Sequence, residues 1–515
     1  MNRMWTVILL IFSIAIAGCG GSSSGGNNSN PVTDPDVQTI GCTDNFGLDL
    51  FAAETDSALG LSWNNQGEFD ASGGYQVRYG TVAEAYGVEE TVDCTNLDCE
   101  TTLTGLNNDT TYYVVVDSLD SLGQPTATSC EISATPHVLT FSDDMAVAPS
   151  ASSQSVPKIA SSWDGKPLFM GWIENGKFVI SRSDDYGLSW SVPDAVWSLG
   201  GVESDPSLTF RRRVVQTNPD TGELEILVEP ALFATFAVDG TVKFIRADFP
   251  DGPTGALSFT APVDIGTGAL PSTAAYADHV EVVYERGGGI WASSSSDGGL
   301  NFSAEQRVDN ATGTMFSARP DVAIDPRNDD VFVAYHGQRG EGNTDIYLNF
   351  SIDGGVYYQE AEVRIDDDTG GGNQSNVSLS TDPRTGHVMA TWEDRRSGSD
   401  VYFSRSIDGG NNWEANLNSG TGLIGDQFTP SAETDPGRNV FVLFIDTSAG
   451  QKPLFNRFNS LGSFDTPKEV SSVAGSAGSA AKTPAITIDK LGRAFVAWAE
   501  NRDGPVDNVF FARGE

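Results

Sequence analysis

A short motif that comes back four times constrains the fold of this chain more than any other feature. In each copy a serine is followed by an aspartate at the second position after it, a glycine at the fourth and an aromatic residue at the seventh. The serines, at positions 183, 295, 351 and 406, are 112, 56 and 55 residues apart, so the first interval spans two repeats. Repeats of this length are typical of solenoids and propellers.

Each repeat predicts four short strands that alternate with turns rich in glycine, asparagine and aspartate. In the most regular repeat, residues 376–380, 387–392 and 400–406 form three expected strands, and the motif then turns the chain into a fourth. The repeats begin near Pro157, Pro206, Pro271, Pro320, Ser375, Pro430 and Pro484. Seven units are favoured, and six units with an irregular segment are the alternative.

The last repeat ends without a fourth strand. Residues 139–142, upstream of the first repeat, are similar to residues 300–303, which begin a fourth strand. We therefore expect the N-terminal segment to complete the last sheet, which closes a ring and leaves no open sheet edge.

The repeated motif is the Asp box of the BNR repeat, and residues 138–515 resemble the sialidase superfamily. The resemblance implies a β-propeller in which the box is structural and lies away from the active site. Its aspartate accepts hydrogen bonds from nearby backbone amides, its glycine adopts a positive φ and its aromatic ring fills the blade. The four structural aspartates are Asp185, Asp297, Asp353 and Asp408.

Residues 40–136 predict a separate module of alternating strands at 58–64, 75–80, 100–106, 111–117 and 127–135. Leu103-Thr104-Gly105-Leu106, followed by Thr110-Thr111-Tyr112, resembles the fibronectin type III signature, and Trp63 stands where that fold keeps its core tryptophan. The expected fold is therefore all-β, with a fibronectin type III-like β-sandwich before the propeller.

The N-terminus predicts export. Residues 7–17 are an apolar run too short to span a bilayer, and they end in Ile16-Ala17-Gly18-Cys19, which resembles the lipobox of bacterial lipoproteins. The resemblance implies a signal peptide over residues 1–19, lipidation of Cys19 and a place in the bacterial cell envelope, as an outer-membrane lipoprotein or at the cell surface. An ordinary secretion signal is the alternative. Residues 20–39, rich in Gly, Ser and Asn, predict a flexible linker.

Four further cysteines, Cys42, Cys94, Cys99 and Cys130, all precede residue 131. An exported chain favours disulfides, and four cysteines allow three pairings. We favour Cys94–Cys99 as a local clamp and Cys42–Cys130 as a bond between the first and last strands of the module.

The charge of the chain restricts its partners. Its 30 basic and 70 acidic residues give a net charge of −40. Nucleic acid is therefore excluded as a partner, because its binding depends on Lys and Arg that neutralise phosphates. A membrane is expected to be contacted through the lipid anchor alone, and the expected ligand is an extracellular glycan or protein.

Candidate site residues gather in the loops between the second and third strands, which form one face of a propeller. They combine aromatic rings, carboxylates and guanidiniums, a set that suits a sugar acid. The candidate catalytic residues are Tyr284, Glu285, Glu393 and Asp394, and the candidate ligand-binding residues are Arg286, Arg339, Arg396, Arg502, Trp392, Trp498 and Glu500. Scaffolding is the alternative, in which Arg339, Arg396 and Arg502 brace their loops through Asp345, Asp400 and Asp507.

The sialidase resemblance does not extend to catalysis. The family's early Arg-Ile-Pro motif is replaced by Val156-Pro157-Lys158, and Tyr284 and Glu285 are adjacent, whereas the family's Tyr–Glu pair comes from separate blades. Three functions stay open: a surface lipoprotein that recognises glycan, an exo-sialidase-like glycoside hydrolase that releases acidic sugars, and a protein-interaction scaffold. No cofactor is expected, because the four histidines lack metal-ligand spacing; a Ca²⁺ site in the acidic turn at residues 366–370 is the alternative.

Overall fold

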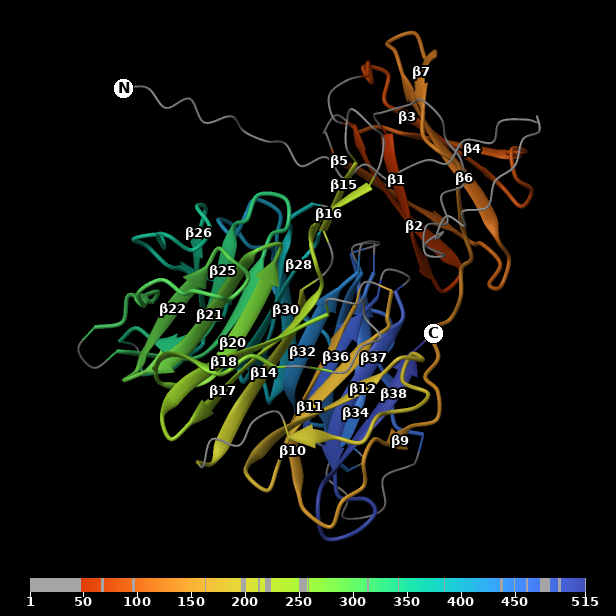
Figure 1. The fold of residues 1–515 in the computed structure, drawn as a ribbon. Helices are drawn as coiled ribbons and strands as arrows, with labels where there is room; N and C mark the ends of the chain where they lie inside the picture. The colour runs from red at the N-terminus through yellow and green to blue at the C-terminus, as the bar shows by residue number, and fades with distance from the viewer. Residues whose placement is uncertain are drawn as a thin grey trace, which may run out of the picture. The chain divides into compact units, whose positions relative to one another are not determined.

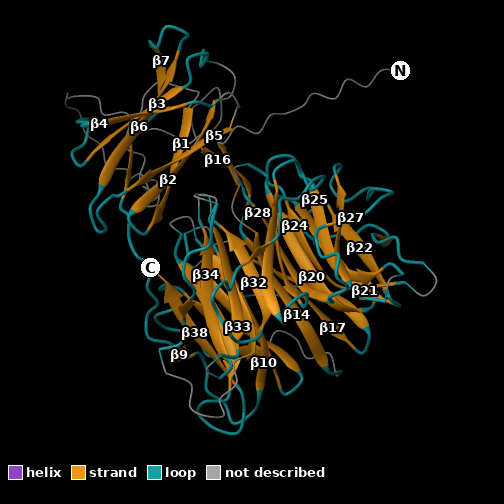
Figure 2. Ribbon diagram, turned by 180° about the vertical axis from the view of Figure 1, so that it is seen from behind, coloured by secondary structure: helices purple, strands orange, loops and turns teal. Residues whose placement is uncertain are grey.

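The computed structural model describes residues 48–514 with short gaps. The gaps are residues 66–68, 95–97, 163, 196–200, 212–213, 218–223, 250–256, 258, 313–314, 341, 384, 436–438, 449, 460–461, 473–481 and 490–491. The predicted signal peptide, the linker, Cys19 and Cys42 lie outside the described residues. Every regular element described is a β-strand, which confirms the all-β class, and none is a helix that could span a membrane (Figure 2).

The chain divides into two compact units. One unit consists of Met1–Val138 with Val215–Leu227, and the other of Leu139–Val214 with Val228–Glu515. Figure 1 shows the strands of both.

The smaller unit has two antiparallel sheets that share one core. The first sheet contains β1 (Leu48–Thr55), β2 (Ala58–Asn65) and β5 (Asp98–Thr104); the second contains β3 (Tyr75–Gly80), β4 (Val88–Val92), β6 (Tyr112–Leu119), β7 (Pro125–Thr128) and β8 (Ile132–Ala134). Alternate residues of both sheets are buried together, and the rings of Trp63 and Tyr75 meet edge to face at 5.4 Å. The hydroxyl of Tyr112 accepts a hydrogen bond from the Asn107 amide at 3.0 Å.

One disulfide of the smaller unit agrees with the prediction, and two of its strands were not predicted. Cys94 and Cys99 are joined by a disulfide, as predicted, and Cys130 is also disulfide-bonded; its predicted partner Cys42 lies outside the described residues. The sequence did not reveal β1 and β4. β4 is mostly exposed and has no apolar alternation that would mark it as a strand.

The larger unit contains, in its described residues, seven antiparallel sheets of four strands, here numbered 1 to 7. Sheet 1 is β10 (Gln154–Ser161), β11 (Leu168–Glu174), β12 (Lys177–Ser183) and β13 (Asp194–Ala195); sheet 2 is β14 (Glu203–Arg211), β17 (Ala231–Val238), β18 (Thr241–Asp248) and β19 (Val263–Thr267); sheet 3 is β20 (Ala269–Tyr276), β21 (His279–Arg286), β22 (Gly289–Ser295) and β23 (Gln306–Arg307); sheet 4 is β24 (Phe316–Ile324), β25 (Val331–Gln338), β26 (Asp345–Ser351) and β27 (Val363–Arg364).

The remaining three sheets follow the same plan. Sheet 5 is β28 (Gln374–Thr381), β29 (Val388–Asp394), β30 (Asp400–Ser406) and β31 (Leu417–Asn418); sheet 6 is β32 (Gln427–Thr434), β33 (Val440–Asp446), β34 (Lys452–Phe458) and β35 (Lys468–Glu469); sheet 7 is β36 (Lys482–Ile488), β37 (Ala494–Glu500), β38 (Asn508–Gly514) and β9 (Met145–Ala146). A hairpin of β15 (Val214–Thr217) and β16 (Leu224–Val228), which the sequence did not reveal, lies between β14 and β17 in the chain, and most of its residues belong to the smaller unit.

The fourth strand of sheet 7 comes from the N-terminal side of the unit. Met145 pairs with Phe511 and Ala146 with Phe510, while Ser142 donates its amide hydrogen to the carbonyl of Arg513 at 2.7 Å. The predicted segment therefore completes the last sheet, although its regular strand begins a few residues later than expected.

Hydrophobic cores lie between neighbouring sheets. Each consecutive pair shares one cluster of buried side chains, and a further cluster joins sheet 7 to sheet 1. The first strands of consecutive sheets contact one another, and β36 of sheet 7 contacts β10 of sheet 1. Every sheet is thus buried on both faces, which explains why strands such as β29, β33 and β37 are buried along their whole length.

The Asp box has the same hydrogen bonds in all four copies. In the copy that begins at Ser406, the serine hydroxyl donates to Asp408 at 2.9 Å and accepts from the Gly410 amide at 2.9 Å, while Asp408 accepts from the Asn412 amide at 2.8 Å. These donors hold the pKa of Asp408 below its usual value, although burial opposes them. The box therefore completes its own turn and leaves its carboxylate without spare capacity for chemistry.

Alanine at Gly410 is expected to lower the free energy of unfolding by about 2–4 kcal/mol, because two costs add. Gly410 has a φ of 84°, and a Cβ there would lie 2.6 Å from the side chain of Leu348 in the preceding sheet. Gly409 is the matched control: its φ is 69°, but a Cβ would meet nothing within 4 Å, so Gly409→Ala is expected to cost about 1 kcal/mol. Urea denaturation compares them, and equal losses would contradict the packing role.

Candidate functional site

The two ends of the sheets in the larger unit differ in character. The box end carries the four Asp boxes. The loop end is the end at which each first strand begins and each second strand connects to the third. All seven first strands contain the same irregularity near this end. Their pairing shifts at one place, and one residue adopts a positive φ between 45° and 53°: Val156, Asp205, Leu270, Arg319, Asn376, Thr429 and Thr483. Positive φ is unfavourable for these residues, so the fold imposes a strained ring on one end of the unit.

Charged side chains from different sheets meet at this ring. Arg319 is exposed and has no hydrogen bond or ion pair with any described residue. Lys158 lies two residues after the bulge of sheet 1, and burial lowers its pKa; Asp321 and Asp205 oppose this shift, and Arg319 adds to it. Sheets 1, 2 and 4 therefore direct these four charges toward a common centre.

Asp321 is fixed in this cluster by its neighbours. Its carboxylate accepts hydrogen bonds from the Ser272 hydroxyl at 2.6 Å and from the Leu379 amide at 2.8 Å, which come from sheets 3 and 5. Its charge partly balances Lys158, whereas Arg319 is left as the exposed cation.

A second set of polar residues occupies one register position on the second strands. Glu285, His336 and Glu393 each pair with the residue that precedes the bulge in sheets 3, 4 and 5. The same position in the other four sheets holds aliphatic residues: Ile173, Ala237, Ile445 and Ala499. Glu285, His336 and Glu393 therefore form a polar arc over three consecutive sheets.

The members of the polar arc differ in their contacts. Glu393 is buried and accepts hydrogen bonds from the Asn376 amide group at 2.7 Å, the Ser375 hydroxyl at 3.2 Å and the Thr429 backbone amide at 2.7 Å. It therefore ties the bulges of sheets 5 and 6 together. Glu285 is half-buried and has no such bonds among the described residues.

His336 is the most unusual member of the arc. Burial, together with the nearby charge of Arg319, lowers its pKa to about 4, so the imidazole is neutral at ordinary pH. Its Nδ1 atom is buried without a hydrogen-bond partner among the described residues. Buried polar atoms normally form hydrogen bonds, so this arrangement of Nδ1 lowers the stability of the fold.

The candidate arginines of sheets 3 and 4 are paired with glutamates near the fourth strands. Arg286 donates to Glu305 at 2.6 and 2.7 Å, and buried Tyr284 donates its hydroxyl hydrogen to the same carboxylate at 2.5 Å. Arg339 likewise donates to Glu362 at 2.9 Å. Burial and the hydrogen bond to Glu305 raise the pKa of Tyr284, so its phenol stays protonated.

The candidates of sheets 5 and 7 form a similar arrangement. Trp392 donates its Nε1 hydrogen to Asp394 at 3.1 Å, and Arg396 donates to Asp394 and to Asp367. In sheet 7, the indole of Trp498 donates to Glu500 at 2.9 Å, and Arg502 donates to both Glu500 and Asp144. Both tryptophans are fully buried.

These guanidiniums brace the loops, but through other carboxylates than the sequence indicated. Asp345 is paired with Arg364 at 2.8 Å and Asp507 with Lys482 at 3.0 Å. Arg339, Arg396 and Arg502 are thus already neutralised by the chain, whereas Arg319 at the same end is not.

The acidic turn at residues 366–370 is occupied by donors from the chain. Asp366 accepts from Arg364 and the Ile346 amide, Asp367 from Arg396 and Asp368 from the amides of Gly370 and Gly372. No group of three or more His, Cys, Asp or Glu residues within the described part of the chain is arranged to hold a metal ion.

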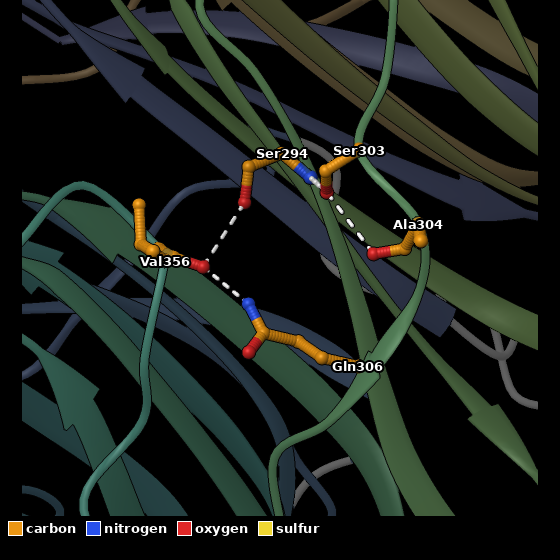
Figure 3. A pocket seen from close by; sticks show the side chains of 6 residues that line it. Ser294, Ser303, Ala304, Gln306 and Val356 are labelled. Carbon is orange, nitrogen blue, oxygen red and sulfur yellow. Dashed lines mark hydrogen bonds between the residues drawn. The ribbon is translucent and has the colours of Figure 1, made fainter.

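A cavity of about 300 Å³ lies between sheets 3 and 4 (Figure 3). It is lined by Ser294, Ser303, Ala304, Gln306, Gly355 and Val356. The carbonyl of Gly355, in an Asp box, accepts hydrogen bonds from Ser294 at 3.4 Å and from Gln306. No titratable side chain lines the cavity, so it offers no chemistry comparable with the loop end.

Sequence reasoning did not single out Asp205, Arg319, Asp321 or Asn376, although the loop that contains His336 was among those expected to form the site. A signal was present: six of the seven bulge residues are followed by proline, at positions 157, 206, 271, 320, 430 and 484. In the sequence, these prolines were interpreted only as the starts of the repeats. The residue before the proline is uncharged in most repeats, but it is Asp205 in the second repeat and Arg319 in the fourth.

Comparisons with known proteins add little beyond this geometry. No protein-family model matches the chain, and no curated protein matches its sequence. Among solved structures, a protein of unknown function from Dyadobacter fermentans is 14% identical over 73% of this chain and 99% of its own, with a TM-score of 0.46. A polysaccharide lyase, an ulvan lyase, is 10% identical over 72% and 95%, with a TM-score of 0.47. The NanB sialidase from Streptococcus pneumoniae is 10% identical over 91% and 94%, with a TM-score of 0.36. Similarities at this level carry no inference about activity.

Proposed function

We propose that the larger unit is a closed seven-bladed propeller that binds the acidic sugar of an extracellular glycan at its loop end. Seven sheets, seven shared cores and the pairing of β9 with β38 support the blade count. The strained ring and the polar arc lie together at one end of these sheets. Ligand sites in propellers lie at such an end, where loops from several blades converge.

One observation carries the proposal. Arg319 is an exposed cation that has no carboxylate partner among the described residues, in a chain whose net charge is −40. The neighbouring candidate arginines are all paired. A guanidinium binds a carboxylate through two parallel hydrogen bonds, and half-buried Glu285 in the adjacent blade supplies a carboxylate that can accept hydrogen bonds from sugar hydroxyls.

Replacing Arg319 by glutamine is expected to weaken the binding of a glucuronic acid-terminated glycan by about 10- to 100-fold, the loss of a charge-assisted hydrogen bond of about 1.5–3 kcal/mol. A glycan array identifies acidic ligands, and isothermal titration calorimetry measures the change. Arg405→Gln is the control, because Arg405 lies at the box end and is paired with Glu414 at 2.9 Å. Wild-type protein that binds no acidic glycan, or equal losses in both variants, would contradict the proposal.

Hydrolysis of the bound sugar is the second candidate. Glu285 and Glu393 occupy the same register position two blades apart, on either side of His336. Two carboxyl groups separated by roughly 5–10 Å across a sugar are what a glycosidase needs. Turnover of fluorogenic glycosides, lost in Glu393→Gln, would favour hydrolysis over binding alone.

The rest of the chain fits a role outside the cell. We propose that Cys19 carries a lipid anchor in a bacterial envelope and that the smaller unit is a fibronectin type III-like spacer. Labelling with a lipid precursor, abolished in Cys19→Ser, tests the anchor.

A further inference from the structure

His336 occupies a position that sets it apart from every other histidine of the chain. It pairs with Ala318, the residue before Arg319, and therefore stands beside the exposed guanidinium. The equivalent residues in the neighbouring sheets are Glu285 and Glu393. A ring nitrogen thus stands where two neighbouring blades place a carboxylate.

The two nitrogens of this imidazole have different surroundings. Nδ1 is buried without a partner among the described residues, whereas Nε2 is not among the buried unsatisfied atoms and has no protein partner in the described part either. The ring packs edge to face near Phe316, with centroids 6.5 Å apart. Nε2 is therefore the atom that a ligand bound at Arg319 can reach.

Burial, together with the charges around His336, keeps the ring neutral. On β24, Arg319 disfavours a second positive charge. On β26, Asp345 is engaged by Arg364, and in sheet 5, Glu393 is held by Asn376 and the Thr429 amide. None of these carboxylates forms an ion pair with the imidazole.

We propose that His336 is a specificity-determining residue of the Arg319 site, which selects a hydroxylated carboxylic acid, such as a uronic acid, over a simple carboxylate. The inference rests on the proposed function of that site. Arg319 takes the carboxylate of the ligand, and Nε2 of His336 takes a hydroxyl group close to it.

A hydroxyl group matches Nε2 in either tautomer through a single atom. It donates to the nitrogen when the nitrogen carries a lone pair, and it accepts when the nitrogen carries hydrogen. A second carboxylate or a sulfate only accepts, and an apolar ring does neither. Without a hydroxyl, Nε2 would lose its contact with water and gain nothing in return, which penalises the wrong ligand.

The test compares methyl β-glucuronide with cyclohexanecarboxylate, which has a similar ring and carboxylate but no hydroxyl groups. Calorimetry on the full chain measures both dissociation constants, and their ratio is the readout. His336→Phe is expected to lower this preference for the glucuronide by about 3- to 10-fold and to leave cyclohexanecarboxylate binding nearly unchanged. His336→Gln, which keeps a donor and an acceptor, is expected to retain most of the preference.

The outcomes separate this inference from the proposed function. If the wild-type chain binds neither compound, the proposal of an acidic-sugar site is itself contradicted. If it binds the glucuronide and Arg319→Gln weakens that binding as expected, but His336→Phe leaves the ratio of dissociation constants unchanged, only the role of His336 is overturned. Binding of cyclohexanecarboxylate by each variant reports that its site is folded, and His336→Leu replaces the phenylalanine variant if that ring is not accommodated.

Discussion

Replacing Arg502 by methionine is expected to lower the free energy of unfolding by about 3–5 kcal/mol. The guanidinium lies between Asp144 and Glu500, whose side chains are 0% and 4% exposed, and its own side chain is 7% exposed. Methionine fills a similar volume but leaves two carboxylates in a buried environment without their cation. Uncompensated buried charge is among the most destabilising changes in a protein.

The same pair of carboxylates makes the effect of Arg502 reach beyond the loop after β37. Asp144 comes from the segment that precedes β9, and it also accepts a hydrogen bond from the Ser472 amide at 2.9 Å. Losing Arg502 therefore weakens the attachment of the closing strand as well as the loop after β37. Urea denaturation followed by tryptophan fluorescence measures the loss.

Arg405→Met is the control for Arg502→Met. Arg405 pairs with Glu414, but these side chains are 21% and 43% exposed, so water replaces the lost partner. An exposed pair contributes about 0–1 kcal/mol. Similar losses in the two variants would show that burial of the carboxylates is not what makes Arg502 important.

The second large effect is a loss of stability at alkaline pH, caused by His279. Its imidazole is buried and lies 2.7 Å from Asp329 and 3.2 Å from Glu281. Burial disfavours the charged ring, but the two carboxylates outweigh it and raise the pKa to about 9. The hydroxyl of Tyr358, the aromatic residue of an Asp box, donates to Glu281 at 2.8 Å, so the cluster joins sheets 3 and 4.

The sign of the effect follows from the raised pKa. The folded chain holds the proton up to about pH 9, whereas the unfolded chain releases it near 6.5. The stabilising contribution is therefore complete below pH 6.5 and is lost as the pH rises through 9. Its full size is about 3 kcal/mol, the equivalent of the difference between the two pKa values.

His279→Gln isolates this contribution. The difference in unfolding free energy between wild type and variant, measured from pH 6 to pH 10, is expected to shrink by about 3 kcal/mol. Parallel curves over this range would contradict a protonated His279 in the folded state. His336→Gln is the control, because burial lowers the pKa of His336 to about 4, so this imidazole is neutral in the folded chain and loses no proton as the pH rises through 9.

The sequence predicted the repeating architecture because that architecture depends on local signals. The serine, aspartate and glycine of each box bond to one another within a few residues, so their spacing is visible without knowledge of the fold. Runs of apolar and aromatic residues between turn signals similarly revealed the second and third strands of sheets 4, 5 and 7.

The candidate site could be predicted only in part, because its contacts are not local. Glu285 and Glu393 were found from their loops, yet their equivalence with His336 depends on strand register. The pairing of Arg502 with Asp144 joins residues from opposite ends of the unit. Arg319 stands out because it has no such partner in the part of the chain that the structure describes, and no pattern in a single sequence shows that a contact is absent.

The closing strand has a consequence for how the chain acquires its fold during synthesis. Met145 and Ala146 precede every other strand of the larger unit, but their partners on β38 follow all the strands of sheets 1 to 6. Sheet 7 therefore cannot be completed until β38 has been synthesised, and β9 stays without its partner strand until then. Such distant pairing slows folding. A truncation that removes Phe510 and Phe511 would leave β9 without a partner, so it should be as damaging as the loss of a strand within one of the other sheets.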